Sequence, residues 1–373
     1  MPRPVRYHTG KFPPKRLDWD RLIPLIGPAS AALARYDGLL SAIPNADVLL
    51  SPLTTQEAVL SSAIEGTLAT MGEVLEFEAG GTDEAIDQKK IDDIHEILNY
   101  RRAMREAVEQ LQKLPLCQRV IKQVHSTLLE GVRGHDKARG RYKPVPNYIG
   151  PMGSTLEQAR FIPIAPENVV EGMSRWEKYL HAPAPDRLVQ LAIAHAEFEA
   201  LHPFLDGNGR VGRMLIPLFL YERELLHAPM FYLSEYLEAN RQKYYARLLA
   251  VSSHDDWTGW CVFFLKALER QAKENEAKTR RILALYEEKK NSIVRATHSQ
   301  YAIAALDFFS SQPVFSSSAF VTEAGIPAPT SRRILKVCQE SGLLKPVRQA
   351  SGRRPAIFAF PELLNIAEGR SVF

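Results

Sequence analysis

Apolar residues recur at three- and four-residue spacing through most of the chain, which is the pattern of amphipathic helices. Residues 56–68 (QEAVLSSAIEGTL) and 91–111 (IDDIHEILNYRRAMREAVEQL) each predict a helix. Thr54 and Glu57 have the spacing of a capping box, so we expect the first of these helices to begin at about Thr54. The first 50 residues are instead interrupted by prolines, and residues 76–90 are acidic and contain glycines, which is typical of a loop.

The stretch 131–166 breaks the helical pattern with short aromatic and β-branched pieces between glycines and prolines. Within it, residues 148–150 and 160–164 predict a small hairpin or flap. Helices resume at about Glu167 and continue through the charged segment 268–293, which predicts a long helix with a solvated face.

The last 75 residues have a different pattern of elements, which begins with a helix expected at 302–309. Two short helices follow, joined by a turn that contains Gly325 and Pro327, and then two strands around Gly352. This order resembles a winged helix-turn-helix, with Ile334, Val337 and Leu344 in its core. The expected fold class is therefore mainly α, with a small β-hairpin flap and a C-terminal winged helix domain.

Composition narrows the class of protein. Hydrophobic residues make up 45% of the chain and charged residues 24%, which is globular composition, and the net charge of +4 is too small to make nucleic-acid binding the default. The cysteines are odd in number and widely separated, so they support neither a disulfide framework nor a zinc ribbon; they are Cys117, Cys261 and Cys338. No run approaches the roughly 18 apolar residues of a membrane span, so we expect a cytoplasmic protein without a membrane partner.

The candidate chemistry lies at residues 194–213 (AHAEFEALHPFLDGNGRVGR). Helical spacing places Leu188, Leu191, His195, Phe198 and His202 on one face, with His202 at the end of the helix before Pro203. A second helix is expected to begin near Asn208. Its glycines let backbone amides approach a ligand, and the amides at a helix start bind anions.

Charged side chains in the same window extend this interpretation. Arg210 and Arg213 add two cations one turn apart, so the ligand implied is polyanionic. Asp206 is placed to hold Mg²⁺ that bridges phosphate oxygens, and His202 is the residue suited to moving a proton at neutral pH. Phosphoryl or nucleotidyl transfer is the reaction class that these residues predict.

Two other patterns also fit this window. Gly207, Gly209 and Gly212 match the GxGxxG pattern of dinucleotide-binding folds, but that pattern follows a strand, whereas a helix ending in His-Pro-Phe precedes it here. His195, Glu199 and His202 could hold zinc, although a histidine on an apolar helix face is more often a core residue.

The residues HPFLDGNGR followed by VGR resemble the HPFx(D/E)GNGRxxR signature of Fic-domain proteins at every fixed position. The resemblance implies a helical core with a hairpin flap, and transfer of AMP from ATP to a Ser, Thr or Tyr hydroxyl of a target protein. It implies that His202 is the catalytic base, that Asp206 holds Mg²⁺ and that Phe204 is a buried anchor. The nucleotide-binding residues that it implies are Gly207, Asn208, Gly209, Arg210, Val211, Gly212 and Arg213, with Arg213 at the γ-phosphate.

Further segments extend the resemblance to about residues 50–290. SSAIEG, with Ser61 and Glu65, is similar to the inhibitory helix of some Fic proteins, in which the glutamate pairs with the arginine that should hold the γ-phosphate. Tyr148 or Ile149 of the flap would clamp the target segment, which the flap aligns by strand addition. Tyr244 and Tyr245 are similar to a pair that contributes to the adenine pocket, while Ser252 stands where an asparagine often follows.

The resulting domain prediction is an N-terminal helical region at 1–105, a Fic catalytic core at 106–291 and a winged helix-turn-helix domain at 292–373. On the winged helix, Ser331, Arg332, Arg333 and Lys336, with Arg348, Arg353 and Arg354 on the wing, are a candidate DNA footprint, although protein contacts or dimerisation would use the same face.

Three functions follow for the whole chain. The first is an adenylyltransferase held inactive by Glu65, acting on a target protein or on itself and expected to be a homodimer. The second is removal of AMP from a modified protein, and the third is a DNA-binding regulator whose Fic core senses nucleotide. The sequence does not decide between ATP and another nucleoside triphosphate.

Overall fold

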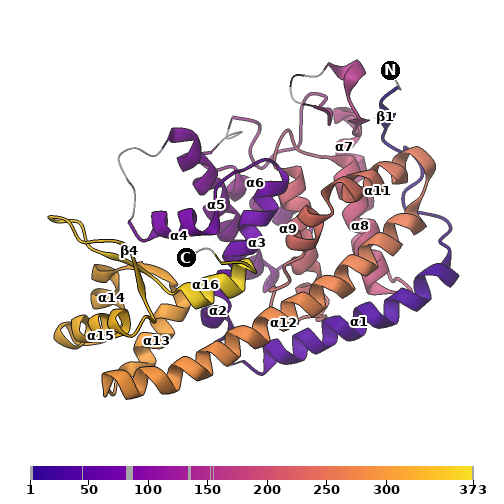
Figure 1. Ribbon diagram of the computed structural model, residues 1–373. Coiled ribbons are helices and arrows are strands. Elements are labelled where there is room, and N and C mark those ends of the chain that lie inside the picture. Colours follow the sequence, from indigo (N-terminus) through magenta and orange to yellow (C-terminus); the bar gives the residue numbers. More distant parts are fainter. Residues whose placement is uncertain are drawn as a thin grey trace. The chain divides into compact units, whose positions relative to one another are not determined.

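The computed structural model describes residues 3–43, 45–80, 87–132, 136–151, 153 and 155–371 (Figure 1). It is mainly helical with little strand, as the sequence predicts. The elements of the first third of the chain are β1 (Val5–Arg6), α1 (Trp19–Ser41), α2 (Ala46–Leu49), α3 (Ser51–Ile64), α4 (Met71–Glu78), α5 (Gln88–Leu111) and α6 (Gln118–Leu128). Those of the middle third are η1 (Leu156–Gln158), β2 (Phe161–Ile162), η2 (Pro166–Asn168), α7 (Val169–His181), α8 (Arg187–Leu201), α9 (Asn208–Glu222), α10 (Ser234–Ala239) and α11 (Arg241–His254).

The last third contains the long helix α12 (Trp257–Thr297), which confirms the helix expected at 268–293, and seven further elements. These are α13 (Ala302–Ser311), β3 (Val314–Ser316), α14 (Ser317–Glu323), α15 (Ala328–Glu340), β4 (Lys345–Arg348), β5 (Ile357–Ala359) and α16 (Pro361–Glu368). Among the described residues, no helix is both long enough and apolar enough to cross a membrane.

The chain forms two compact units built from alternating segments. The first unit contains Met1–Gly38, Leu60–Gly66 and Asn99–Lys273, and the second contains Leu39–Val59, Thr67–Leu98 and Glu274–Phe373. The division expected at 1–105, 106–291 and 292–373 remains a prediction.

Helix α1 is the largest element that the sequence analysis missed. It contains Pro24 and Pro28, each of which removes a backbone hydrogen bond and costs an interior helix turn about 3 kcal/mol. Leu22, Leu33 and Tyr36 are nevertheless buried on one face of this helix, and Tyr36 Oη donates to the carbonyl of Met230 at 2.6 Å. Burial of that face offsets the cost of the prolines.

The capping box at Thr54 and Glu57 was wrong. Helix α3 begins at Ser51, so Thr54 lies inside it and its amide donates to the carbonyl of Leu50 at 3.3 Å. A capping box does occur at the next helix, where Thr70 and Glu73 bond to each other's backbone amides at the start of α4. The loop expected at 76–90 lies partly outside the described residues, since α4 continues to Glu78 and α5 begins at Gln88.

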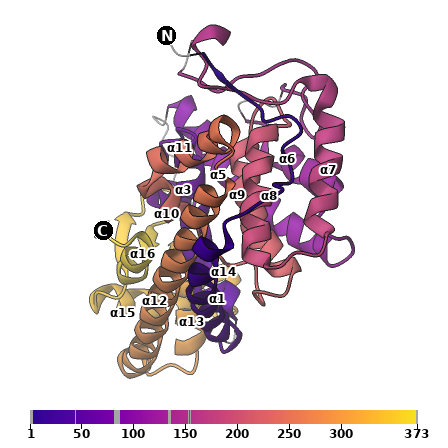
Figure 2. The ribbon, with the colours of Figure 1, turned by 90° about the vertical axis from the view of Figure 1, so that its right-hand side faces the viewer.

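In the first unit, α8 lies between α7 and α9 (Figure 2). Indole nitrogens fix α8 from two sides: Trp176 Nε1 donates to the carbonyl of Ala194 at 2.8 Å, and Trp260 Nε1 donates to that of Ala192 at 2.6 Å. The helix begins after Asp186, whose side chain accepts from the amide of Val189 at 2.8 Å. This rigid central helix ends at the residue that the sequence places at the centre of the chemistry.

The flap is smaller than expected, and it has an additional partner. Ile149 and Phe161 form a single antiparallel bridge, whereas β2 pairs in parallel with β1 near the N-terminus. Sequence analysis missed β1 because two residues carry no alternation pattern. Strand β2 therefore has a neighbour on each edge.

The second unit holds a three-stranded antiparallel sheet of order β3-β5-β4. The two short helices and the two strands expected after residue 311 are present as α14, α15, β4 and β5, while β3 and α16 were missed. Aromatic rings fill the core, with centroid distances between 5.0 and 6.4 Å among Phe308, Phe309, Phe315 and Phe320.

Candidate active site

The side chain of Asn208 closes the loop between α8 and α9 through two hydrogen bonds. Asn208 accepts from the backbone amide of Phe204 through Oδ1 and donates to the carbonyl of Phe204 through Nδ2, both at 2.8 Å. Phe204 is fully buried, as expected of an anchor. The side chain of Asn208 is therefore occupied inside the loop, and only its backbone amide is available to a ligand.

His202 caps α8 in a left-handed backbone conformation, with φ 45° and ψ 60°. This conformation costs a non-glycine residue about 1–2 kcal/mol, and such strain is characteristic of functional positions. Burial, with a further contribution from the ammonium of Lys143, lowers the pKa of His202 to about 4. The imidazole is thus neutral at pH 7 and can accept a proton.

His125 is a site residue that the sequence analysis missed. Its ring stacks on Phe204 with centroids 3.8 Å apart and planes 6° apart. The amide of Gly140 donates to its Nδ1 at 2.9 Å, so Nε2 carries the proton and donates to the carbonyl of Asp206 at 3.0 Å. Burial lowers the pKa of His125 to about 4, which keeps this tautomer neutral. This role of His125 is visible from its buried position on α6, and the spacing of residues in the sequence does not indicate it.

The start of α9 is the candidate anion site. Gly207 has φ +75°, and the amides of Asn208 and Gly209 in the first helical turn have no partner within the helix. Val211 departs from the expectation, because its amide already donates to the carbonyl of Gly207 at 3.0 Å and its side chain is fully buried. Gly212 packs against α8, where an added Cβ would lie 2.2 Å from Oε1 of Glu199. Both residues thus pack against neighbouring groups, and their contact with a nucleotide remains a prediction.

The segment with Ser61 and Glu65 reaches this site from the end of α3. Arg213 is 2% exposed, and its Nη2 donates to Oε1 of Glu65 at 2.8 Å. Arg213 also donates to Ser61, from Nε to Oγ at 2.9 Å and from Nη2 to the carbonyl oxygen at 2.8 Å. Although burial alone would raise the pKa of Glu65, the charge and hydrogen bond of Arg213 hold it below its ordinary value. Glu65 is therefore a carboxylate at neutral pH.

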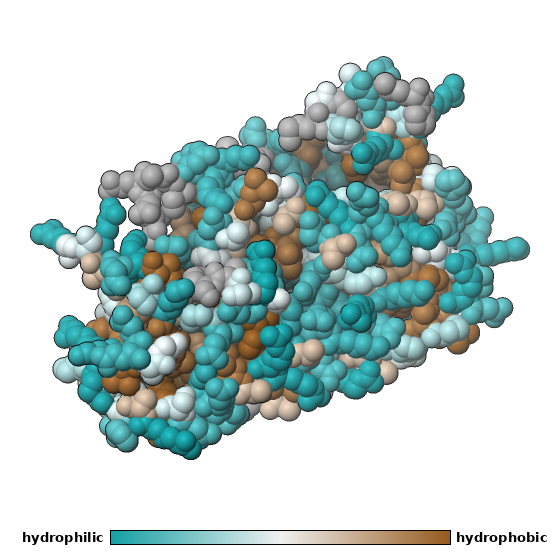
Figure 3. Space-filling view, in the orientation of Figure 1, coloured by the Kyte–Doolittle hydropathy of each residue, from teal (hydrophilic) through white to brown (hydrophobic). Residues whose placement is uncertain are grey.

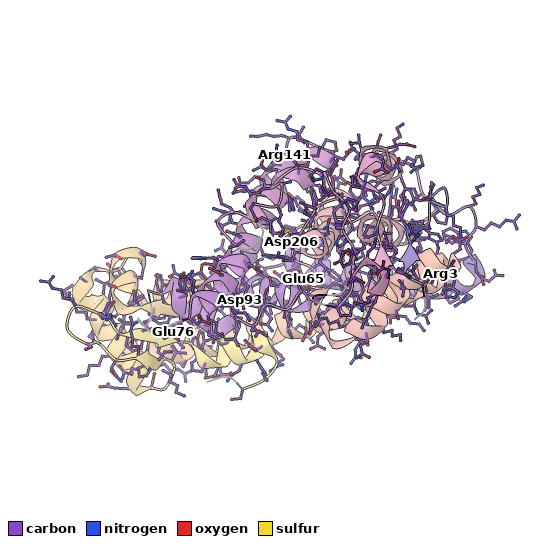
Figure 4. The ribbon with its side chains drawn as sticks, turned by 90° about the horizontal axis from the view of Figure 1, so that it is seen from above. Arg3, Glu65, Glu76, Asp93, Arg141 and Asp206 are labelled. Carbon is purple, nitrogen blue, oxygen red and sulfur yellow. The ribbon has the colours of Figure 1, made fainter. Side chains whose placement is uncertain are left out.

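Asp206 is labelled beside Glu65 in the view of Figure 4. Their charges both act on His202, raising its pKa against the effect of burial. Oδ1 of Asp206 accepts from the amide of Gly207 at 2.6 Å and lies 3.7 Å from Nη2 of Arg210. Oδ2 lies 3.5 Å from Nζ of Lys137, and the carboxylate is about one third exposed.

Asp206 fits Mg²⁺ only if substrate phosphates supply further ligands to the ion. No group of three His, Cys, Asp or Glu side chains is gathered for a metal within the described ranges. Mg²⁺ keeps several waters and is commonly held by one or two carboxylates together with substrate phosphates. Asp206 supplies one such carboxylate beside the start of α9.

His195 is a satisfied core residue. Its Nδ1 donates to the carbonyl of Gly212 at 3.0 Å, its Nε2 accepts from the hydroxyl of Tyr244 at 3.0 Å, and its ring stacks on Trp260. Tyr244 is fully buried against α8, which favours a role in core packing over direct contact with the adenine ring of a nucleotide. Tyr245 is 39% exposed and presents its ring at the surface. Burial, with a smaller contribution from the charge of Glu65, raises the pKa of Tyr245 to about 12.

Two side chains attach the flap to the loop between α8 and α9. Lys143 is buried and donates from Nζ to Oδ1 of Asn147 at 2.7 Å and to the carbonyl of Leu201 at 3.3 Å. Asn147 in turn donates from Nδ2 to the carbonyl of Phe204 at 2.8 Å. Tyr148 and Ile149, which follow directly, are both exposed. The flap thus has a fixed register relative to His202.

The N-terminal segment adds a second fastening that the sequence did not reveal. Tyr7 and His8 both bond to the buried carboxylate of Glu197 on α8, at 2.6 and 2.8 Å. His8 Nδ1 also lies 2.7 Å from Oγ of Ser252, the position whose role in the adenine pocket was in doubt. Because β1 directly precedes these residues, the strand beside β2 is anchored to the central helix.

Comparison with known proteins places this site in a family. Residues 23–109 match the model described as Fic/DOC family N-terminal, and residues 115–220 match the Fic/DOC family model, so together they cover just over half of the chain. The protein adenylyltransferase Fic of Drosophila grimshawi is 32% identical over 167 residues, which are 43% of this chain and 31% of that protein. A protein adenylyltransferase of Caenorhabditis briggsae is 28% identical over 163 residues, which are 42% of this chain and 30% of that protein.

The fold is also similar to that of a solved structure. The crystal structure of a Fic family protein from Desulfovibrio desulfuricans superposes with a TM-score of 0.59 at 20% identity, covering 93% of this chain and 98% of that one. The chain spans about a third of the length of the curated relatives that it matches. The matched segments contain His202, Asp206, Arg213 and Glu65 together, and the chain belongs to the Fic/DOC family.

Proposed function

We propose that this protein transfers AMP from ATP to a Ser, Thr or Tyr hydroxyl of a target protein, and that Glu65 restrains the reaction. The names of the curated relatives support an adenylyltransferase at the level of the family. The observation that carries the proposal for this chain is the position of the Glu65 carboxylate, which lies on Arg213 at the start of α9. An anion already occupies the place where the polyphosphate of a nucleotide would bind.

In the proposed reaction, His202 accepts the proton of the target hydroxyl as its oxygen attacks the α-phosphorus of ATP. The new oxygen–phosphorus bond forms while the bond from the α-phosphorus to the bridging oxygen breaks, and pyrophosphate leaves with that electron pair. A Mg²⁺ held by Asp206 would offset charge on the phosphate oxygens. The backbone amides of Asn208 and Gly209, with Arg210, would orient the phosphates, and Arg213 would hold the γ-phosphate.

Restraint follows from competition for one cation. While Arg213 bonds to Glu65 and Ser61, its donors are directed at the inhibitory segment and not at a γ-phosphate. The negative charge of Glu65 beside the first amides of α9 also repels phosphate. ATP would then bind in a pose that leaves the α-phosphate out of line with the target hydroxyl.

The test is incubation of purified protein with Mg²⁺ and ATP radiolabelled at the α- or the γ-phosphate, followed by denaturing gels of the protein alone and of lysate. Wild type, Glu65→Gly and Glu65→Gly/His202→Ala are compared. Label from the α-phosphate only, stronger in Glu65→Gly and absent from the double variant, is expected. Label from the γ-phosphate, or equal α-label in wild type and Glu65→Gly, would contradict the proposal. The gel of protein alone reports self-modification, and size-exclusion chromatography tests the expected homodimer.

Removal of AMP from a modified protein is the second candidate, and one observation favours it. The carboxylate of Glu65 lies beside Gly209 at the start of α9, and its charge acts to raise the pKa of His202. In this reaction Glu65 would orient a water for attack on the phosphodiester. Incubating wild type with a protein that Glu65→Gly has first labelled, and measuring released AMP, distinguishes the two. Release by wild type and not by Glu65→Gly would assign that activity to Glu65.

A further inference from the structure

The C-terminal part of the second unit carries a basic face that adenylyl transfer does not use. Residues 328–356 contain seven Lys and Arg residues and a single acidic residue, Glu340. The elements around them follow the order α13, β3, α14, α15, β4, β5, with a sheet of order β3-β5-β4. That order places α15 as the second helix of a helix-turn-helix and the β4–β5 connection as its wing.

Helix α15 has two clearly different faces. Ile334, Leu335 and Cys338 are buried, and the hydroxyl of Ser331 is buried too, because it donates to the carbonyls of Ile326 and Pro327. Ser331 therefore cannot contact a ligand, which corrects the footprint expected from the sequence. Arg333 is exposed but anchored, since its Nη1 donates to the carbonyl of Thr297 at 2.7 Å.

The outward face of α15 is formed by Arg332, Lys336 and Gln339, which are all exposed. Their spacing of four and three residues places them one above another on a single stripe. Lys336 pairs with Glu340 at 3.8 Å, and because both side chains are largely exposed this ion pair holds the ammonium only weakly. A stripe of two cations and an amide matches the side chains that read guanine and adenine in the major groove.

The wing, which is the β4–β5 connection, ends in a tight turn. Ser351 and Arg354 exchange backbone hydrogen bonds at 3.1 and 2.9 Å, which closes a tight turn over Gly352 and Arg353, and Gly352 has φ +56°. Figure 1 shows this yellow hairpin extending away from α14 and α15, and Figure 3 shows hydrophilic residues at its tip. Arg353 is exposed at that turn.

The composition of the face distinguishes DNA from protein as the partner. Within residues 298–371, as far as the structure describes them, no large hydrophobic side chain is exposed. Protein interfaces depend on buried aromatic and aliphatic anchors, whereas interfaces with DNA are polar and strongly positive. We propose that α15 and the β4–β5 wing form a binding site for duplex DNA, with Arg332, Lys336 and Gln339 facing the major groove and Arg353 facing the phosphate backbone.

The test uses the full chain and a fluorescein-labelled duplex of about three helical turns, with fluorescence anisotropy measured between about 50 and 200 mM salt. Arg332→Glu/Lys336→Glu is compared with Lys266→Glu/Arg270→Glu, a matched control on α12 in which both residues are exposed and have the same spacing and charge. Circular dichroism melting checks that each variant is folded.

We expect wild type and the α12 control to bind with the same affinity, and the α15 variant to bind at least about tenfold more weakly with a salt slope shallower by about 2. Equal loss in both variants, or no binding of wild type at low salt, would overturn the proposal. An oligomer or protein complex that only the α15 variant loses, without DNA binding by wild type, would identify a protein interface instead. Selection from a random duplex pool then tests base preference, which a purely electrostatic surface would not show. The proposal does not depend on adenylyl transfer, and the α15 variant should retain any such activity of the wild type.

Discussion

Oε1 of Glu65 lies so close to the backbone of Gly209 that a Cβ at this glycine would be 2.1 Å from it. The absence of a side chain at position 209 therefore lets the inhibitory carboxylate reach the first turn of α9. A phosphate would need the same close approach. In the proposed function, Gly209 therefore serves both ligands, and the Glu65 carboxylate and a phosphate would exclude each other for a steric as well as an electrostatic reason.

Ser61→Ala is expected to raise AMP transfer, although less than Glu65→Gly. The substitution removes the partner of Arg213 Nε while leaving Glu65 in place. An unsatisfied buried donor costs about 1–3 kcal/mol, so the free energy of unfolding should fall by that amount. Labelling at saturating ATP and denaturant titration measure the two effects.

Ser62 provides the matched control for that experiment. It is adjacent, it is equally buried, and its Oγ makes no hydrogen bond to a described residue. Ser62→Ala should leave both AMP transfer and stability nearly unchanged. Equal activation by the two serine variants would show that loosening of α3, and not release of Arg213, relieves the restraint.

Lys143→Met is expected to shift the pH dependence of AMP transfer. The ammonium of Lys143 helps to lower the pKa of His202 to about 4, so its removal should raise that pKa toward the ordinary value of about 6.5. The base must be neutral to accept a proton, and activity is lost as pH falls through its pKa. In the Glu65→Gly background, the Lys143 variant should therefore begin to lose activity at a higher pH than its parent as the solution is acidified.

Burial lowers the pKa of Lys143 itself to about 7, so the lysine is charged at the acidic pH where His202 titrates. Its charge can therefore lower the pKa of His202 there. Arg141→Met is the control, since it removes a positive charge two residues away on an exposed side chain. An acid limb that does not move in Lys143→Met would mean that burial alone sets the pKa of His202.

Much of the site could be predicted because its residues are close in sequence. Helix α8 with His202 at its end and a second helix from Asn208 follow from local periodicity and from Pro203, and the structure has both. His125 and Lys143 reach the site from distant segments and left no local signal, because their contacts exist only in the folded chain. Ser61 and Glu65 are equally distant, but a short motif revealed them.

Other errors arose where packing overrides local preference. Pro24 and Pro28 argue against a helix, yet the buried face of α1 outweighs them. Ser331 and Arg333 lie in a basic run that indicates an exposed footprint, but hydrogen bonds to backbone carbonyls occupy both. Tyr244 and Tyr245 are adjacent and chemically identical, and only the turn of α11 buries one and exposes the other.

His125 should position the Asp206 loop, and two substitutions separate its contacts. His125→Phe retains an aromatic ring to stack on Phe204 but leaves the Gly140 amide and the Asp206 carbonyl unpaired. His125→Gln retains a donor and an acceptor but loses the stack. If the hydrogen bonds fix Asp206, the Phe variant should need more Mg²⁺ for half-maximal AMP transfer than the Gln variant.

This comparison is made in the Glu65→Gly background by Mg²⁺ titration, with denaturant unfolding in parallel. Both variants are expected to be less stable, by about 1–3 kcal/mol for each polar group left unpaired in His125→Phe. A structural role alone would lower stability without changing the Mg²⁺ requirement, and that result would contradict positioning.

Tyr148→Ala and Ile149→Ala are expected to raise the KM for the target protein while leaving the KM for ATP unchanged. Both side chains are exposed next to Asn147, which is fastened to the catalytic loop. Both edges of β2 are already paired, one with β1 and one with Ile149, so a target segment cannot add to β2 itself and has to approach from outside these partners. Leu156→Ala is the matched control, because it truncates an equally exposed apolar side chain in the same region, away from the bridge. If all three variants raise the KM for the target alike, general hydrophobic contact and not the register at Ile149 determines how the target segment is held.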